Sequence, residues 1–154
     1  MVEASMSRVL VTGSKGFIGK NLVVQLNERA DTEVLSFSRS DPIQALVALV
    51  SKADAIVHLA GENRPSDVAD FARVNTDLTH SLCEAVRASG RKIPLILASS
   101  TQAEYDNPYG KSKLEAERAV ERLAQETENP VCIYRLPGVF GKWCKPNYNS
   151  VVAT

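Results

Sequence analysis

Short apolar runs alternate with amphipathic stretches along almost the whole 154-residue chain, and this alternation limits how the chain can fold. Apolar runs that predict buried strands lie at 8–12, 33–37, 55–60, 93–98 and 131–135. Apolar residues with helical spacing lie between them, at 18–30, 42–50, 71–86 and 116–124. The alternation predicts an α/β fold, a doubly wound parallel sheet with helices on both faces in three α/β/α layers. Ligands of such sheets bind beyond the carboxyl ends of the strands.

A glycine-rich turn directly follows the first expected strand. Gly13-Ser14-Lys15-Gly16-Phe17-Ile18-Gly19 is a G-x-x-G-x-x-G pattern that opens a helix. Gly13 permits a tight turn, Gly16 lets the backbone approach a pyrophosphate, and Gly19 lets the helix lie close to the strand. The backbone N–H groups and the helix dipole then favour phosphate. Glycines also form plain turns, but the strand–turn–helix context favours a dinucleotide-binding Rossmann fold.

The end of the second expected strand bears on the choice of cofactor. It runs Ser36-Phe37-Ser38-Arg39 and lacks the carboxylate that would bind the ribose of NAD. The Arg39 guanidinium, together with Lys15 in the glycine turn, has the charge to bind the extra phosphate of NADP. We therefore expect NADPH as the preferred cofactor. NAD stays open, because both cations are equally explained as solvated surface residues.

A candidate catalytic group follows the fourth expected strand, which ends in hydroxyl residues. Tyr109 and Lys113 are four residues apart and share one face of a helix. Asn107 and Pro108 are a plausible cap and first position for that helix. A lysine ammonium near the phenol is expected to lower the tyrosine pKa from about 10, which would let Tyr109 transfer a proton. The Thr101 hydroxyl would hold the substrate oxygen beside it.

Composition excludes several other classes of function. Lys plus Arg and Asp plus Glu both number 18, so the balanced charge predicts no nucleic-acid or anionic-membrane partner. No apolar run approaches the roughly 20 residues that cross a bilayer. The three cysteines, Cys83, Cys132 and Cys144, have no metal-ligand spacing, so no metal site is predicted. Reduced thiols indicate a cytoplasmic protein. His58, at a strand end, is interpreted as a packed or cofactor-edge residue rather than a base.

Together these residues resemble the extended short-chain dehydrogenase/reductase family, which contains sugar-nucleotide epimerases, dehydratases and reductases. The resemblance rests on the glycine turn, His58-Leu59-Ala60-Gly61, Val74-Asn75, the Ser-Ser-Thr strand end, and Tyr109 with Lys113. It implies that Thr101, Tyr109 and Lys113 form the proton-relay triad and that Asn75 helps to orient the active site. It also implies that Lys113 contacts the nicotinamide ribose and that the cofactor contacts Leu59, Ala60 and Gly61.

A closer resemblance is to the capsular-polysaccharide reductases on the route to UDP-N-acetyl-L-fucosamine. It is carried by three segments, 60–65, 106–113 and 141–150. It implies a UDP-sugar as substrate and NADPH-dependent reduction of the C4 ketone of a UDP-linked deoxy N-acetylhexosamine, with Tyr109 protonating the alkoxide. On this basis residues 1–141 are expected to form the NAD(P)-binding domain and 142–154 to begin a substrate-binding segment. The chain therefore reads as an N-terminal fragment that binds cofactor and can lack turnover by itself.

Two departures from the family pattern are visible in the sequence. Only one short helix fits between the second and third expected strands, so a strand common in the wider family is absent. Gly138 stands where relatives usually carry an Asn that contacts the nucleotide sugar, which weakens the inference about substrate.

Two other functions stay open. One is an epimerase or dehydratase that retains NAD, which Arg39 disfavours. The other is a dinucleotide-binding regulator without chemistry, which Tyr109 and Lys113 disfavour. Family members often form a homodimer through paired helices, although the apolar stripes of these helices are equally explained by packing on the sheet.

Overall fold

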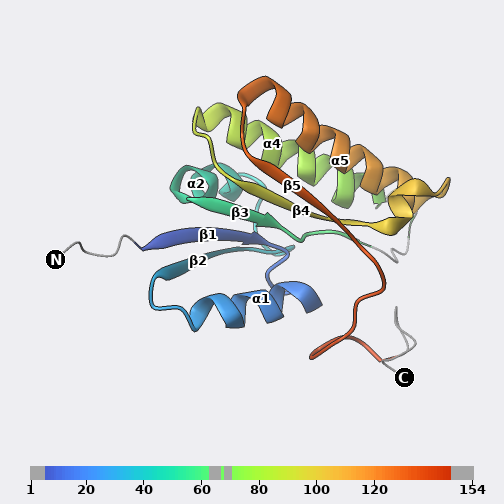
Figure 1. Ribbon diagram of the computed structural model, residues 1–154, viewed down its shortest axis with the longest axis horizontal. Coiled ribbons are helices and arrows are strands. Elements are labelled where there is room, and N and C mark those ends of the chain that lie inside the picture. Colours follow the sequence, from blue (N-terminus) through green and yellow to red (C-terminus); the bar gives the residue numbers. More distant parts are fainter. Residues whose placement is uncertain (1–5, 63–66, 68–70, 147–154) are drawn as a thin grey trace.

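The five expected strands form one parallel sheet in the order β2-β1-β3-β4-β5 in this computed structural model (Figure 1). The strands are β1 (Ser7–Thr12), β2 (Thr32–Phe37), β3 (Ala55–His58), β4 (Leu95–Ser100) and β5 (Val131–Leu136). The structure describes residues 6–62, 67 and 71–146. In register, Thr12 pairs with Phe37 on one side and with His58 on the other. The chain passes from β1 outward to β2 and returns across β1 to β3, so the strand order reverses between β1 and β3.

The helices cover the two faces of the sheet unequally. They are α1 (Phe17–Asn27), α2 (Ala45–Lys52), α4 (Leu78–Ser89) and α5 (Pro108–Thr127), with short segments η1 (Ala72–Asp77) and η2 (Thr101–Glu104). Helix α1 lies on one face, and α2, α4 and α5 pack side by side on the other (Figure 1). Right-handed crossovers explain this, because only the β1–β2 connection runs toward the β2 edge of the sheet. The predicted three-layer α/β/α arrangement is confirmed.

The main hydrophobic core lies between the sheet and the layer of α2, α4 and α5. Fully burying one Leu or Ile side chain contributes about 1.5–3 kcal/mol. The largest fully buried aliphatic residues of this core come from strands, helices and the loop before β4: Leu10, Leu46, Ile56, Leu82, Ile93, Leu95, Leu97 and Leu123. This core fixes the carboxyl ends of β1, β3 and β4 at one edge of the sheet.

Several element boundaries differ from those predicted. Helix α2 begins at Ala45, because Ala45 N and Leu46 N bond to the carbonyls three residues earlier in a turn that contains Pro42. Strand β3 ends at His58 instead of residue 60, and β4 runs to Ser100 instead of residue 98. The hydroxyl residues expected just after β4 therefore lie partly within it.

The long helix predicted from residue 71 onward has two parts. Residues 72–77 form a π-helical segment, η1, and regular α-helix begins at Leu78. Helix α4 then ends at Gly90, which has the left-handed φ of +63°. Wide π-helical turns are rare and often occur at functional sites, and η1 contains Asn75.

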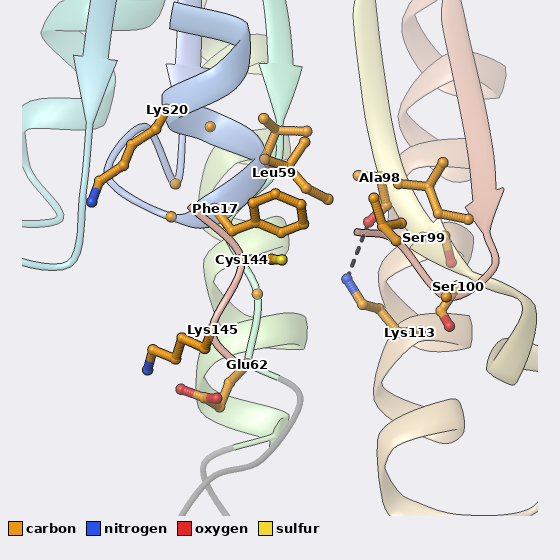
Figure 2. Close-up of a pocket in the computed structure, with 18 of the residues that line it drawn as sticks. Phe17, Lys20, Leu59, Glu62, Ala98, Ser99, Ser100, Lys113, Cys144 and Lys145 are labelled. Carbon is orange, nitrogen blue, oxygen red and sulfur yellow. Dashed lines mark hydrogen bonds between the residues drawn. The ribbon is translucent and has the colours of Figure 1, made fainter. Parts of the chain in front are cut away.

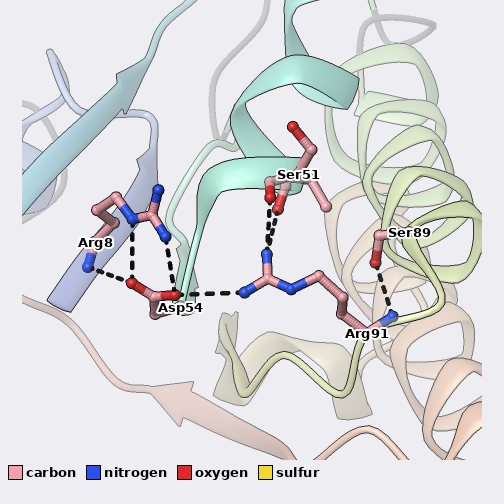
Figure 3. A network of polar contacts seen from close by, with 6 residues as sticks. Arg8, Ser51, Asp54, Ser89 and Arg91 are labelled. Atoms are coloured by element: carbon pink, nitrogen blue, oxygen red, sulfur yellow. Dashed lines mark hydrogen bonds and ion pairs between the residues drawn. The ribbon is translucent and has the colours of Figure 1, made fainter.

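A network of ion pairs joins the amino ends of the strands, away from the glycine turn (Figure 3). Asp54 accepts hydrogen bonds from the Arg8 backbone N at 2.9 Å and the Arg91 guanidinium at 3.3 Å. Arg91 also donates to the Ser51 carbonyl at 2.9 Å. The hydrogen bonds from Arg8 hold the pKa of Asp54 below its usual value of 3.8. This network links β1, α2 and the segment before β4.

The segment after β5 has no helix or strand from residue 137 to residue 146. It returns to α1, where the Asn21 side chain donates to the carbonyls of Phe17 and Lys142 at 2.9 and 2.8 Å. The rest of the expected substrate-binding segment, 147–154, lies outside the described residues. Within the part of the chain that the structure describes, no helix is long and apolar enough to span a membrane.

Candidate active site

The turn between β1 and α1 is packed so tightly that it requires glycine. Gly13 has a φ of +71°, and a Cβ on it would lie 2.7 Å from the backbone N of Ala60. A Cβ on Gly19 would lie 2.1 Å from the Gly13 carbonyl oxygen. The close approach that Gly19 allows is therefore between α1 and the turn just past β1. Gly16 caps α1 without a side-chain acceptor, so first-turn N–H groups are left for an anion.

A cleft of about 1200 Å³ separates this turn from β4 and α5 (Figure 2). Its walls include Phe17 and Leu59 on one side, and Ala98, Ser100 and Lys113 on the other. Among the described residues lining it there is one carboxylate, on Glu62, and the cationic side chains are more numerous: Lys15, Lys20, Arg39, Lys113 and Lys145. Such an excess of positive charge favours an anionic ligand.

Arg39 and Lys15 both lie beside the end of β2. The Arg39 guanidinium pairs with the Glu62 carboxylate at 2.6 Å, although the Arg39 side chain is 76% exposed. Lys15 Nζ donates to Ser40 Oγ at 3.1 Å. Because most of the Arg39 side chain is exposed, its guanidinium is accessible to a phosphate from solvent as well as to Glu62.

The first carboxylate after β2 belongs to Asp41, and it forms hydrogen bonds within its own turn. It accepts hydrogen bonds from the Ser38 backbone N at 2.7 Å and from Ser38 Oγ at 2.8 Å. These bonds lower the pKa of Asp41 from 3.8 and keep it ionised. Its place in this turn agrees with the expectation that β2 offers no free carboxylate to a ribose.

His58 is buried at the end of β3 and linked on both sides. Its Nδ1 lies 2.6 Å from Thr12 Oγ1, and its Nε2 lies 2.9 Å from Thr79 Oγ1. Because Thr79 donates its hydroxyl proton to the Asn75 carbonyl at 2.6 Å, it accepts from His58, which places the proton on Nε2. Burial, and then the charge of Lys113, lower the pKa of His58 to about 3. His58 is thus a neutral packed residue, as expected.

Asn75 connects the loop after β3 to α5. Its side chain accepts from Glu62 N at 2.8 Å and donates to the Glu62 carbonyl at 2.9 Å and to Ser112 Oγ at 3.0 Å. Ser112 Oγ in turn donates to the Tyr109 carbonyl at 2.7 Å. Asn75 is buried beneath the cleft, so its contacts are with the residues that shape the cleft wall.

Tyr109 and Lys113 lie on one face of α5, which begins as predicted. The Asn107 side chain accepts from Gly110 N at 2.8 Å, and Pro108 is the first helical residue. Lys113 Nζ lies 5.9 Å from the centre of the Tyr109 ring and donates to the Ala98 carbonyl at 3.1 Å (Figure 2). Both residues line the cleft.

The pKa of Tyr109 differs from the expectation. Burial raises it above 10, and the hydrogen bond with the Ser100 hydroxyl offsets only part of this effect. The expected lowering of the pKa by Lys113 is therefore wrong for this structure, since the lysine ammonium bonds to a carbonyl instead of the phenol. Burial also lowers the pKa of Lys113 from 10.5 to about 8.

Two hydroxyls flank Tyr109 at the end of β4. Ser100 is buried, caps η2 by accepting from Gln102 N at 3.1 Å, and bonds to the Tyr109 phenol. Thr101 is exposed and lines the cleft. The sequence predicts a role for Thr101 alone, because the part played by Ser100 depends on the extra length of β4.

The structure brings most of the predicted residues to one cleft. Those that line it are Gly13, Lys15, Gly16, Phe17, Ile18, Gly19, Arg39, Leu59, Gly61, Thr101, Tyr109 and Lys113. Ala60 packs on Gly13, and Asn75 lies beneath, so these two support the wall. Lys20 also lines the cleft and is not among the predicted residues, although its place in the first turn of α1 could have indicated an anion site. A cation in the first turn of a helix opposes the helix dipole unless an anion binds there.

The segment after β5 completes the cleft. Trp143, Cys144 and Lys145 line it, and Figure 2 shows Cys144 and Lys145 across the cleft from Ser99 and Ser100. Gly138 also lines it, with open space around its Cα. Residues 63–65 and 147–150, which carried part of the resemblance to the capsule reductases, lie outside the described residues.

A model of the NAD dependent epimerase/dehydratase family matches residues 9–154. The chain belongs to this family. It is 52% identical over 147 residues to UDP-2-acetamido-2,6-beta-L-arabino-hexul-4-ose reductase of Pseudomonas aeruginosa, covering 96% of this chain and 40% of that protein. The chain therefore spans less than half the length of this relative.

Solved structures of similar proteins show the same fold. The capsular polysaccharide assembling protein CapF of Staphylococcus aureus superposes with a TM-score of 0.81 at 43% identity, over 94% of this chain and 39% of CapF. UDP-glucuronic acid 4-epimerase of Bacillus cereus, solved in complex with NAD, gives a TM-score of 0.78 at 21% identity, over 92% of this chain and 59% of that one. The second similarity concerns the fold alone.

Proposed function

We propose that this chain is the cofactor-binding part of an NADPH-dependent reductase that acts on a UDP-linked 4-keto deoxy N-acetylhexosamine. The observation that carries the proposal is a single cationic cleft with the glycine turn on one wall and Tyr109 with Lys113 on the other. The similarity to the Pseudomonas aeruginosa reductase supports the substrate class. CapF, a capsular polysaccharide assembling protein, supports a role in capsule or O-antigen sugar synthesis.

The described residues fit a dinucleotide. The uncapped N–H groups at the start of α1 would hold the pyrophosphate, with Lys20 adding positive charge. Arg39 and Lys15 would bind the 2′-phosphate of NADPH. Lys113 would contact the nicotinamide ribose. When bound, NADPH would supply the hydride that reduces the C4 carbonyl of the sugar.

Tyr109 would supply the proton that completes the reduction. Once the C4 carbon has received the hydride, the carbonyl oxygen would be an alkoxide, and the Tyr109 phenol would give its proton to that oxygen. The burial that raises the pKa of Tyr109 keeps the phenol protonated before the reaction. The nearby Lys113 ammonium stabilises the phenolate that remains. Thr101, and Ser100 beside it, would donate hydrogen bonds to the substrate oxygen.

A chimera tests this proposal. This chain replaces the matching 147 residues of the Pseudomonas aeruginosa reductase, and NADPH oxidation is followed with the 4-keto UDP-sugar that the reductase uses. We expect turnover by the chimera. Tyr109→Phe is expected to abolish turnover while sparing NADPH binding, and Tyr105→Phe serves as the matched control because Tyr105 is exposed outside the cleft lining. Turnover by Tyr109→Phe at the native rate would contradict the assigned role.

Tightly held NAD in the purified protein would instead favour an epimerase or dehydratase that recycles its cofactor. We expect the enzyme to work in the cytoplasm, where the free thiols of Cys83, Cys132 and Cys144 stay reduced. Light scattering on the purified chain decides whether it forms a homodimer.

A further inference from the structure

A buried carboxylate lies one helical turn beyond Lys113. Glu117 follows Lys113 by four residues on α5, so both side chains share the face that packs on the sheet. Only 8% of Lys113 and 3% of Glu117 is exposed. Two consecutive residues of β4 hold them: the Ala98 carbonyl accepts from Lys113 Nζ at 3.1 Å, and the Ser99 hydroxyl donates to Glu117.

Arg135 holds the other side of Glu117. From β5, its Nε and Nη2 donate to the Glu117 carboxylate at 3.0 and 2.7 Å, and its Nη1 donates to Glu104 at 2.9 Å. Burial works to raise the pKa of Glu117, but the hydrogen bonds from Arg135 and Ser99 outweigh it, so the pKa falls below 4.5. Glu117 is therefore a carboxylate at neutral pH.

The titratable groups around Lys113 come from three elements. Tyr109 and Glu117 flank it on α5, His58 faces it from β3 as a neutral ring, and Arg135 reaches Glu117 from β5. Burial lowers the pKa of Lys113, and Glu117 is the group that opposes this effect. An uncharged lysine at this place would not stabilise a Tyr109 phenolate.

We propose that Glu117 is a positioning residue of the candidate active site, which keeps Lys113 cationic beside Tyr109, and that Arg135 limits how strongly its charge acts on Lys113. The inference rests on the proposed function in one respect, the role of Lys113 as a cation in the proton relay. The effect of Glu117 and Arg135 on the charge of Lys113 does not depend on that function.

Two substitutions in this network are expected to shift the pKa of Lys113 in opposite directions. Glu117→Gln keeps the shape of the side chain but removes the negative charge, so the pKa of Lys113 should fall by about one pH unit or more. Arg135→Met removes a cation and leaves the Glu117 charge less compensated, so the pKa of Lys113 should rise. If the network had only a structural role, both variants would disturb the packing around Lys113 and shift its pKa in the same direction.

The measurement is an NMR titration of this 154-residue chain with isotope-labelled lysine, in which Lys113→Arg identifies the Lys113 signal. Glu121→Gln is the matched control, because Glu121 lies one further turn along α5 and is exposed. Circular dichroism establishes that each variant is folded, and Glu117→Asp offers a second variant that retains the charge. Equal Lys113 pKa values in the native chain, Glu117→Gln and Arg135→Met would overturn the proposal, as would shifts in the same direction.

NADPH titrations of the same variants separate this inference from the proposed function. Binding by Glu117→Gln should weaken at a lower pH than binding by the native chain, since Lys113 loses its proton earlier. Absence of NADPH binding by the native chain and the chimera would refute the proposed function and leave the opposite shifts of Lys113 unaffected.

Discussion

Gly19→Ala sets helix propensity against packing and so tests the geometry of the glycine turn. Alanine is favoured over glycine inside a helix by up to about 1 kcal/mol, so propensity alone predicts a more stable protein. The structure predicts the opposite. The new Cβ would lie 2.1 Å from the Gly13 carbonyl oxygen, about 1.3 Å short of the 3.4 Å at which ordinary contact begins.

No flexible side chain can relieve this contact, because the nearest atoms all belong to the backbone of Gly13 and Ser14. Overpacking of this kind costs about 1–3 kcal/mol, which outweighs the gain in propensity. We expect a net loss of about 1–2 kcal/mol in the free energy of unfolding, measured by urea denaturation. Displacement of the turn should also weaken NADPH binding at least about tenfold, or about 1.4 kcal/mol.

Gly138→Ala is the control for stability, since a Cβ there meets no atom within 4 Å. Its free energy of unfolding should change by less than about 0.5 kcal/mol. If Gly19→Ala were more stable than the native chain and bound NADPH equally well, the packing of α1 on the turn would be incorrect.

Three further predictions concern Ser100, His58 and Asp54. Ser100→Ala should raise the pKa of Tyr109 further, because its hydrogen bond opposes burial, whereas Thr101→Ala should leave it unchanged; NMR titration of Tyr109 compares the two. For His58, whose folded pKa of about 3 lies below its unfolded value of 6.5, stability should be full above pH 6.5 and fall by about 1.4 kcal/mol per pH unit as the pH drops toward 3. The free energy of unfolding of His58→Gln, measured by denaturation at several pH values, should lack this pH dependence. An unchanged slope of that free energy against pH would argue against a neutral buried ring. Asp54→Asn should lose about 1 kcal/mol or less at pH 7 and retain NADPH binding. Because the folded pKa of Asp54 is lowered, this difference should persist above its unfolded pKa of 3.8 and vanish as the pH falls through the folded value, which acid denaturation of both proteins measures.

Local signals in the sequence were sufficient for the strands, the glycine turn and the start of α5. Asn107 and Pro108 identify the helix that presents Tyr109, because capping depends on neighbours within one turn. The fold class followed from the alternation of strands and helices, since it depends on periodicity rather than on particular contacts.

The details that depend on distant residues could not be predicted in this way. The pairing of Arg39 with Glu62 joins residues 23 positions apart, and Glu117 on helix α5 pairs with Arg135 on strand β5. The direction of the Tyr109 pKa shift depends on how deeply the phenol is buried, which the spacing of Tyr109 and Lys113 does not determine. The π-helical turn at Asn75 likewise has no periodic signature over six residues.

The proposed function requires that the cleft binds a dinucleotide and prefers NADPH. A fluorescence titration of the chain with NADPH and NADH tests this, alongside Arg39→Ala and the control Lys52→Ala, whose lysine is also exposed. A hydrogen bond to a charged group contributes about 1.5–3 kcal/mol, so we predict NADPH binding about tenfold or more tighter than NADH. Arg39→Ala should reduce this preference, and Lys52→Ala should preserve it. Equal affinity for the two cofactors would refute the role of Arg39, and binding of neither would refute the dinucleotide site.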